Sequence, residues 1–117
     1  MTENTIKKIS VEKVGTAKTP HNVDVRKLLS FEHATIVHIL LKPGESLHPH
    51  ITPVDALFYG LEGQGIVSVG QEEARLSQDE MVFSPKGIKH LLRNESSEDF
   101  RFLVIKVPTQ KQKTTLL

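Results

Sequence analysis

The segment PGESLHPH, residues 43–50, carries two histidines, His48 and His50, two positions apart and shortly after a proline–glycine turn. Positions i and i+2 of a β-strand face the same side, so two imidazoles on a strand can converge on one point. Such convergence is typical of a metal site, and the simpler alternative is a solvated polar pair on an edge strand. A third histidine, His90, ends the similar segment PKGIKH, residues 85–90. We therefore expect the fold to bring His90 beside His48 and His50.

The chain length bounds the domain organisation. With 117 residues, the chain has the size of one compact domain. We predict a single domain over residues 1–117, with its core at about 23–107. Residues 1–20 are expected to form an N-terminal strand arm, because β-branched residues are spaced through this polar segment. Residues 108–117 lack an apolar pattern before their last two leucines and are expected to form a loose tail.

Composition excludes several classes of function. The chain has no cysteine, which removes disulfides, thiolate metal sites and cysteine nucleophiles, and this fits a reducing cytosol. The net charge is +1, so nucleic-acid binding is not indicated. No apolar run approaches the roughly 18 residues of a membrane span, and the N-terminus lacks the apolar region of a signal peptide. We expect a soluble cytoplasmic protein with no nucleic-acid or membrane partner.

The hydrophobic pattern predicts an all-β fold with little or no helix. Residues 34–41 (ATIVHILL) are short, β-branched and followed by a KPG turn, which is typical of a buried strand. About eight to ten short strands alternate with glycine and proline turns, which indicates a sandwich or a barrel. Because Pro49 and Pro53 cannot donate to a sheet, the strand at 46–51 should be an edge strand or bent. The other strands are predicted at 23–26, 56–62, 66–69, 73–77, 80–84, 89–94 and 100–107.

The histidine segments resemble the two motifs of the cupin superfamily. In the first motif a glycine precedes a His-x-His pair; here five residues separate Gly44 from His50, and His48 is the first histidine of the pair. In the second motif a Pro-x-Gly precedes a histidine and an asparagine. The second motif is matched in register by Pro85, Gly87, His90 and Asn94. The resemblance covers about residues 34–107 and implies a double-stranded β-helix, the RmlC-like jelly-roll barrel.

Two positions depart from the cupin pattern. The glycine that opens the second motif is replaced by Asp79, which should alter a turn. The first motif also contains a carboxylate, and Asp55 is the nearest acid, but the usual spacing falls on Ala56, which cannot bind a metal. Asp55 is therefore either a fourth ligand or an exposed loop acid, and the sequence leaves open which way it points.

The resemblance implies a divalent metal held by His48, His50 and His90, with Asp55 as the uncertain fourth ligand. Imidazole ligands suit Fe, Zn, Ni and Cu, and a carboxylate adds preference for Mn or Fe, so the metal is not distinguishable. Without Asp55 the three histidines would be closer to a zinc or copper site. Occupancy should fall below about pH 6.5, because imidazoles bind metal only when neutral.

Two classes of function remain open. The first is a metal-dependent oxygenase, isomerase or lyase that acts on a small molecule. The second is a non-catalytic module that binds a metal or a small ligand. No catalytic residue can be assigned, since His38, Tyr59 and Glu62 are equal candidates for a general base. His21 and His33 are expected on the surface.

We expect a homodimer. Jelly rolls leave edge strands that a second subunit often covers. The alternating segment at 5–14 is available to pair with such a neighbour.

Overall fold

The computed structural model describes residues 5–111 and 114–117. Within this part of the chain there are ten strands and one short 3-10 turn, η1 (Val11–Lys13), which confirms the all-β prediction. None of the described helical segments is long and apolar enough to cross a membrane. The strands form two five-stranded sheets in which every neighbouring pair is antiparallel.

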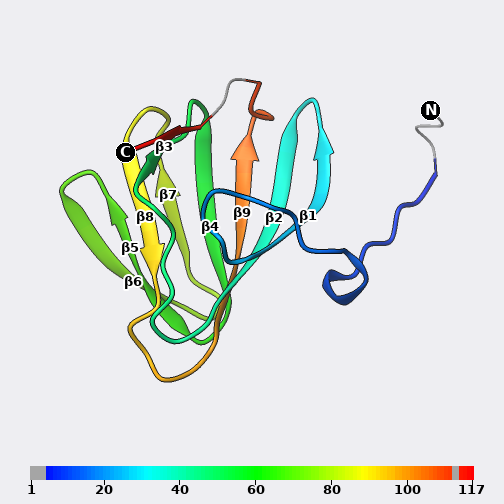
Figure 1. Cartoon of the computed structure of the whole chain (residues 1–117). Coiled ribbons are helices and arrows are strands. Elements are labelled where there is room, and N and C mark those ends of the chain that lie inside the picture. The colour runs from blue at the N-terminus through cyan, green and yellow to red at the C-terminus, as the bar shows by residue number, and fades with distance from the viewer. Residues whose placement is uncertain (1–4, 112–113) are drawn as a thin grey trace.

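The two sheets face each other as the layers of a jelly roll (Figure 1). We name each sheet after its middle strand. The β9 sheet has the order β1 (Asp24–Phe31), β2 (Ala34–Leu41), β9 (Phe100–Val107), β4 (Asp55–Glu62) and β7 (Met81–Ser84). The β8 sheet has the order β10 (Thr115–Leu116), β3 (His50–Ile51), β8 (Lys89–Arg93), β5 (Gln64–Val69) and β6 (Glu72–Ser77).

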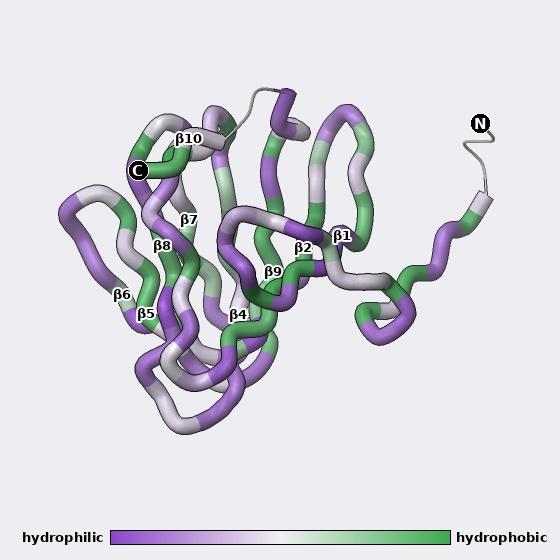
Figure 2. The backbone as a smooth tube through the Cα atoms, in the orientation of Figure 1, coloured by the Kyte–Doolittle hydropathy of each residue, from purple (hydrophilic) through white to green (hydrophobic). Residues whose placement is uncertain are grey.

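The core lies between the two sheets and follows the period of two that strands impose. Along β9, Phe100, Phe102 and Val104 are buried, while the residues between them are only half-buried. In Figure 2 most of this strand is hydrophobic, with hydrophilic residues interrupting it. The buried residues of β9 belong to the same core as Val67 of β5 and Leu92 of β8. Because alternate side chains point to opposite faces, each strand contributes one apolar face to this core.

The predicted strand at 46–51 is much shorter in the structure. Only His50–Ile51 forms β3, and Ser46 makes a single isolated bridge with Arg93. Pro49 has no N–H to donate and separates these two contacts, so His48 lies outside the strand. The expectation that His48 and His50 share one strand face is therefore wrong.

The two ends of the chain also differ from expectation. Thr115–Leu116 forms β10 and pairs with β3, with Leu116 opposite His50, so these two residues do not belong to a loose tail, while residues 112–113 of that segment lie outside the described residues. Within residues 5–20, the only regular element is η1, and the predicted N-terminal strand is not formed there. Residues 1–4 of the predicted arm lie outside the described residues.

The barrel has two chemically different ends. β9 runs upward in Figure 1 and β8 runs downward, so the last residues of β9 and the first residues of β8 lie at the same, upper end. We call this the histidine end, since it contains His50, His90 and Lys106. We call the opposite end the arginine end, since it contains Arg93 and Arg101.

Candidate functional site

His50 and His90 meet inside the histidine end. The two residues are direct partners in the pairing of β3 with β8, and their Nε2 atoms lie 3.0 Å apart. Both side chains are buried, with exposed fractions of 8% and 2%. The ring of Phe58 packs edge-on against His90, with ring centres 5.3 Å apart, and closes the inner side of the pair. The structure thus brings together two of the predicted ligands that are 40 positions apart in the sequence.

Hydrogen bonds fix the tautomer of His50 and leave two choices for His90. Nδ1 of His50 lies 2.7 Å from the carbonyl of His48. A carbonyl can only accept, so Nδ1 carries the proton and Nε2 of the neutral ring is bare. Nδ1 of His90 lies 2.7 Å from the Ser84 hydroxyl, which can donate or accept. Nε2 of His90 also lies 3.1 Å from the Thr52 hydroxyl, as well as 3.0 Å from Nε2 of His50. If Ser84 donates, Nε2–H of His90 donates to Nε2 of His50 or to Thr52. If Ser84 accepts, Nε2 of His90 is bare and can accept from Thr52, while a cation between the two bare Nε2 atoms would remove their repulsion.

Both imidazoles are neutral near physiological pH. Burial, followed by the neighbouring His50 and the Lys106 ammonium, lowers the pKa of His90 to about 3. Burial also lowers the pKa of His50, although its hydrogen bond to the His48 carbonyl opposes this effect. Neutral imidazole is the form that binds metal, so the site is poised for a cation rather than for a proton.

His48 and His21 form the outer part of the site. His48 is exposed, and its ring stacks on His21 with ring centres 5.7 Å apart, while the His21 ring lies 4.9 Å from that of His50. Nδ1 of His21 accepts the backbone N–H of His48 at 2.9 Å. Burial, followed by the charges of His50 and His48, lowers the pKa of His21 to about 4. The sequence predicts His21 on the surface; the structure shows it half-buried, and its long-range hydrogen bond to His48 holds it beside the site.

Asp55 is not brought to the histidines. Along β4, Ala56 and Phe58 are buried and face the core, so Asp55 belongs to the opposite, outward set of residues. Its carboxylate accepts the backbone N–H of Lys86 at 2.9 Å. The structure therefore gives Asp55 the role of holding the turn before His90, and the usual ligand position is held by Ala56.

The three candidate general bases lie away from the histidine site. Tyr59 is on the outward face of β4, and its hydroxyl donates to Asp79 at 3.0 Å. Glu62 pairs with Arg101 at the arginine end. His38 is 3% exposed and its Nε2 accepts from Nε of Arg101, which leaves its buried Nδ1 without a hydrogen bond.

The residues present fit a metal ion in part. Across residues 5–111 and 114–117, no three His, Asp or Glu side chains are arranged as they stand to hold an ion. The pair His50 and His90 fits two ligand positions, since nitrogens at about 2.1 Å from one ion lie roughly 3.0 to 3.4 Å from each other. His48 is the remaining predicted ligand, and a rotation of its exposed side chain is needed to complete a three-histidine set.

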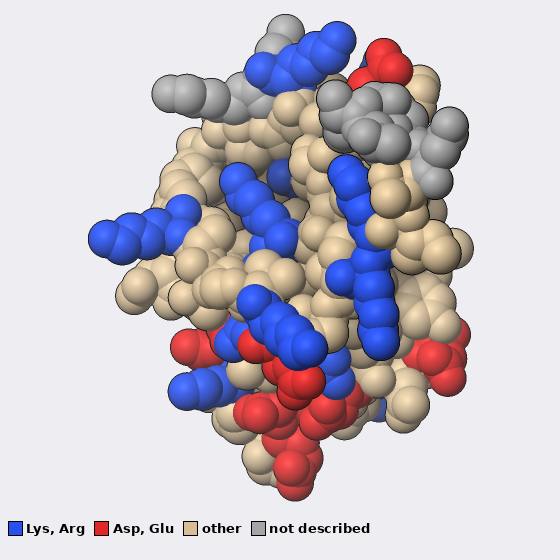
Figure 3. Space-filling view, turned by 90° about the vertical axis from the view of Figure 1, so that its right-hand side faces the viewer, with Lys and Arg blue, Asp and Glu red and all other residues tan. Residues whose placement is uncertain are grey.

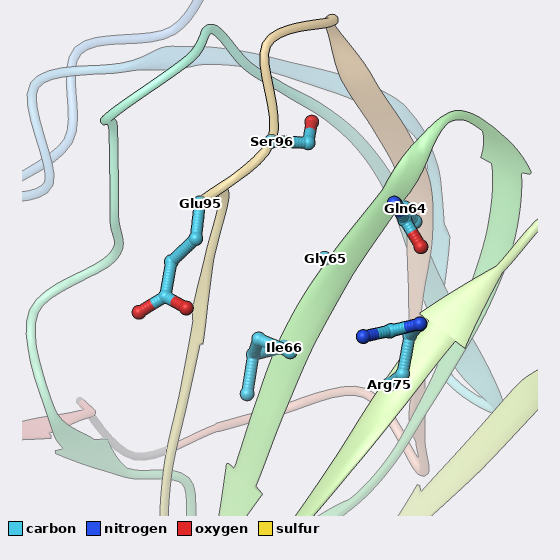
Figure 4. Close-up of a pocket in the computed structure, with 6 residues that line it drawn as sticks. All are labelled: Gln64, Gly65, Ile66, Arg75, Glu95 and Ser96. Carbon is cyan, nitrogen blue, oxygen red and sulfur yellow. The ribbon is translucent and has the colours of Figure 1, made fainter.

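A separate pocket lies at the arginine end, away from the histidine site. It has a volume of about 200 Å³ and lies where β5, β6 and the segment after β8 meet (Figure 4). Its charged residues are Arg75 and Glu95, and Glu95 is already paired with Arg93 at 2.7 Å. None of the four histidines of the site lines this pocket.

Comparison with known proteins settles the family. The family model described as the cupin domain matches residues 37–106. This chain belongs to the cupin family. Solved structures of similar shape include proteins described as having a double-stranded β-helix fold, which confirms the predicted architecture.

Three similar proteins differ in how much they share with this cupin. It is 41% identical over 61 residues to the tetracenomycin polyketide synthase protein TcmJ of Streptomyces glaucescens, a match that covers 51% of this cupin and 41% of TcmJ. The chain thus matches less than half of the length of TcmJ. TT1209 from Thermus thermophilus has a TM-score of 0.74 and 30% identity, over 88% of this chain and 96% of TT1209. The polyketide cyclase RemF from Streptomyces resistomycificus has a TM-score of 0.82 over 97% of this chain and 86% of RemF; at 19% identity it shows the fold alone.

Proposed function

We propose that this cupin binds a divalent metal ion through Nε2 of His50 and His90, with His48 as third ligand, and acts on a small organic molecule. The observation that carries the proposal is the 3.0 Å separation of two buried Nε2 atoms whose rings are held from behind by the His48 carbonyl and the Ser84 hydroxyl. Oxygen partners on the second nitrogen orient imidazole ligands in metal sites.

The chain's own residues prepare this site. The Ser84 hydroxyl can reverse its hydrogen bond so that the proton of His90 moves to Nδ1 and Nε2 becomes bare. Phe58 keeps water from the inner side of His90. A bound divalent ion would supply a Lewis acid for a substrate oxygen, which oxygenases, isomerases and lyases all use, and Fe, Mn, Zn, Ni and Cu all remain candidates. The names of TcmJ and RemF support an organic molecule as the ligand of such a barrel.

A second candidate function is a non-catalytic module that binds a metal or a small ligand. The observation in its favour is that Tyr59, Glu62 and His38 all lie away from the histidines, so none of them is placed to act as a general base there. Turnover of a substrate by the metal-loaded protein would decide for the enzyme.

The metal proposal is tested by the metal content of the purified protein, measured by mass spectrometry after incubation with each candidate ion. We expect close to one ion per chain in the wild type and a loss in His50→Ala and His90→Ala. His33→Ala is the matched control, because this side chain is 75% exposed and lies beside Glu32. Equal metal content in all four proteins, or none in the wild type, would contradict the proposal.

We also propose that a second copy of the chain covers the outward face of the β9 sheet. An antiparallel sheet exposed to water usually has a polar outer face, but here Leu57, Leu103 and Ile105 are half-buried outward residues and Phe83 is 55% exposed. Five strands about 4.8 Å apart and about seven residues long present roughly 550 Å², which approaches the area of about 800 Å² that each partner buries in a standard interface.

The assembly is tested by the mass in solution at micromolar concentration. We expect a dimer that dissociates in Phe83→Lys, since a buried ammonium would lie in the interface. Glu72→Lys introduces the same side chain on an exposed position of β6 and should remain dimeric. A monomeric wild type would contradict the assembly without affecting the metal proposal.

A further inference from the structure

We propose that the groove at the histidine end, beside the metal site, binds the carboxylate group of a small organic acid through Lys106 and Lys27. The idea that this acid is the substrate rests on the proposed function. The binding of its carboxylate does not, because it is argued only from the two lysines.

Lys106 occupies a position where the strand pattern calls for an apolar residue. Phe100, Phe102 and Val104 point from β9 into the core, and Lys106 follows them at the same spacing of two. Its strand partners are Thr35 of β2 and Ala56 of β4, and Ala56 is itself a core residue. The Lys106 side chain therefore enters the barrel, and burial lowers its pKa, with a further contribution from the Lys27 ammonium.

Among the described residues, the positive charge of Lys106 has no carboxylate partner. Its Nζ donates to Oε1 of Gln110 at 3.0 Å, which uses one of the three N–H groups of an ammonium. The ion pairs in this part of the chain join arginines and a histidine to acids, and they include neither Lys106 nor Lys27. Lys106 is half-buried, and partial removal of a charge from water is costly unless the charge is paired, so an anion that enters the groove reduces this cost.

The groove has room for a ligand and leaves the lysines as its donors. It has a volume of about 400 Å³, and its lining includes Lys27, Lys106 and Lys111. Three of its hydroxyls form a chain of bonds: Ser30 and Thr35 share a bond of 2.9 Å, Thr35 donates to Thr109 at 3.0 Å, and Thr109 donates to the Phe31 carbonyl. The hydroxyl of Thr114 accepts from the Gln110 amide at 2.8 Å. The protons of the three linked hydroxyls are therefore used within the chain, and the ammonium groups remain to hold an anion.

The positive charge of Lys106 in this groove acts on the histidines of the site. After burial and the neighbouring histidines, the charge of Lys106 lowers the pKa of both His21 and His90, and after burial it also lowers that of His50. Figure 3 shows the side of the molecule that lies on the right in Figure 1. In its upper half, Lys and Arg side chains surround a hollow, and most of the Asp and Glu side chains lie in its lower half. A small acid held by its carboxylate at Lys106 can therefore extend its other end toward His50 and His90.

The donor set favours a carboxylate over a phosphate. Phosphate sites in proteins are typically built from backbone N–H groups, often at a helix N-terminus, or from arginines that bind bidentately. The charged residues that line this groove are lysines, and its described lining includes neither an arginine nor a helix N-terminus. A volume of about 400 Å³ also lies in the range of small-molecule pockets.

The test is a titration of metal-free, EDTA-treated protein with succinate, followed by two-dimensional ¹⁵N–¹H NMR. We expect saturable shifts at the backbone amides of Lys106 and Gln110. Lys106→Met should weaken binding about tenfold, and Lys27→Gln, at an exposed position, by about threefold. Lys106→Arg keeps the charge and should retain binding. The matched control is Lys42→Gln, at the other end of β2, which should bind as the wild type does.

The absence of saturable shifts in the wild type, or equal affinity in the wild type, Lys106→Met and Lys27→Gln, would overturn the proposal. Tighter binding of inorganic phosphate than of succinate would overturn the carboxylate assignment. If Lys106→Met fails to fold, Lys27→Gln alone decides between these outcomes. The titration uses metal-free protein, so its result is independent of metal binding. If the protein binds succinate but takes up no metal, the proposed function is contradicted and this inference still holds.

Discussion

The two ends of the barrel treat their polar groups in opposite ways. At the arginine end, Arg93 pairs with both Glu73 and Glu95, and Arg101 pairs with Glu62. Asn94, which is 1% exposed, donates to the carbonyls of Leu41 and Glu98 and accepts from Ser96. These bonds give the charged groups of Arg93 and Arg101, and the side-chain amide of Asn94, partners within the chain.

At the histidine end a charged group lacks a partner of opposite sign among the described residues. Lys106 has an amide oxygen as its partner in place of a carboxylate, and the Nε2 atoms of His50 and His90 face each other. Proteins retain such groups where function requires them, and they lose some stability as a result. The difference supports the proposal that the histidine end binds a ligand, with the arginine end contributing to the stability of the fold.

The largest expected effect is at the arginine end. Asn94→Ala should lower the free energy of unfolding by about 3 kcal/mol, because it leaves two buried carbonyls and a backbone N–H without partners. Urea unfolding measures this loss. Metal and succinate binding by the folded fraction should stay unchanged. A loss of binding that parallels the loss of stability would contradict the view that the two ends have separate roles.

The second expected effect is a pH dependence from the histidine end. In metal-free protein His90 has a pKa of about 3 when folded and near 6.5 when unfolded. Below pH 6.5 only the unfolded chain binds this proton, so stability is full above 6.5 and falls as the pH drops toward 3. His90 alone should remove about 2 kcal/mol between pH 6.5 and about pH 4.5. His90→Gln should flatten the stability curve in this range, and parallel curves for the two proteins would contradict the assignment.

A third effect has the opposite sign. Lys106→Met should raise the free energy of unfolding by about 1 kcal/mol, because it removes a half-buried ammonium that has no carboxylate partner in the described part of the chain and keeps an apolar stem of similar length. Thermal and urea unfolding both measure it. A clear destabilisation would mean that Lys106 is structural, which would remove one of the supports for the ligand-binding end.

The smallest expected effect is the loss of an exposed ion pair. Arg93→Met should destabilise the protein slightly, since Glu73 and Glu95 are largely exposed. Urea unfolding in about 1 M salt should abolish the difference from the wild type, because salt screens exposed charges. A difference that survives in salt would assign the effect to the packing of the arginine side chain.

The fold follows from local patterns in the sequence. Short β-branched runs such as 34–41 and turns such as Pro43–Gly44 determine strands and their ends, and the two cupin motifs fix how the strands pair. Even the departure at Asp79 is explained, since its backbone adopts a φ of 64°, which glycine adopts most easily and aspartate tolerates. β10 was missed because its partner, β3, is defined only by contacts between distant parts of the chain.

The site was predictable only where the two motifs act together. They placed His50 opposite His90, but Pro49 removed His48 from the strand, and the register of β4 turned Asp55 outward. His21 could not be found from a local pattern, because it reaches the site through its bond to the backbone of His48. Lys106 gave a readable signal, since it continues the inward alternation of Phe102 and Val104 on β9.

The most direct test of the account is the ¹⁵N NMR spectrum of the histidine side chains before and after addition of one equivalent of zinc. Without metal, His50 should carry its proton on Nδ1, as its bond to the His48 carbonyl requires. With zinc, the Nε2 signals of His50 and His90 should shift together, while those of His33 and His38 stay in place. Unchanged signals at His50 and His90, or larger shifts at His33 or His38, would contradict the assignment of the metal site.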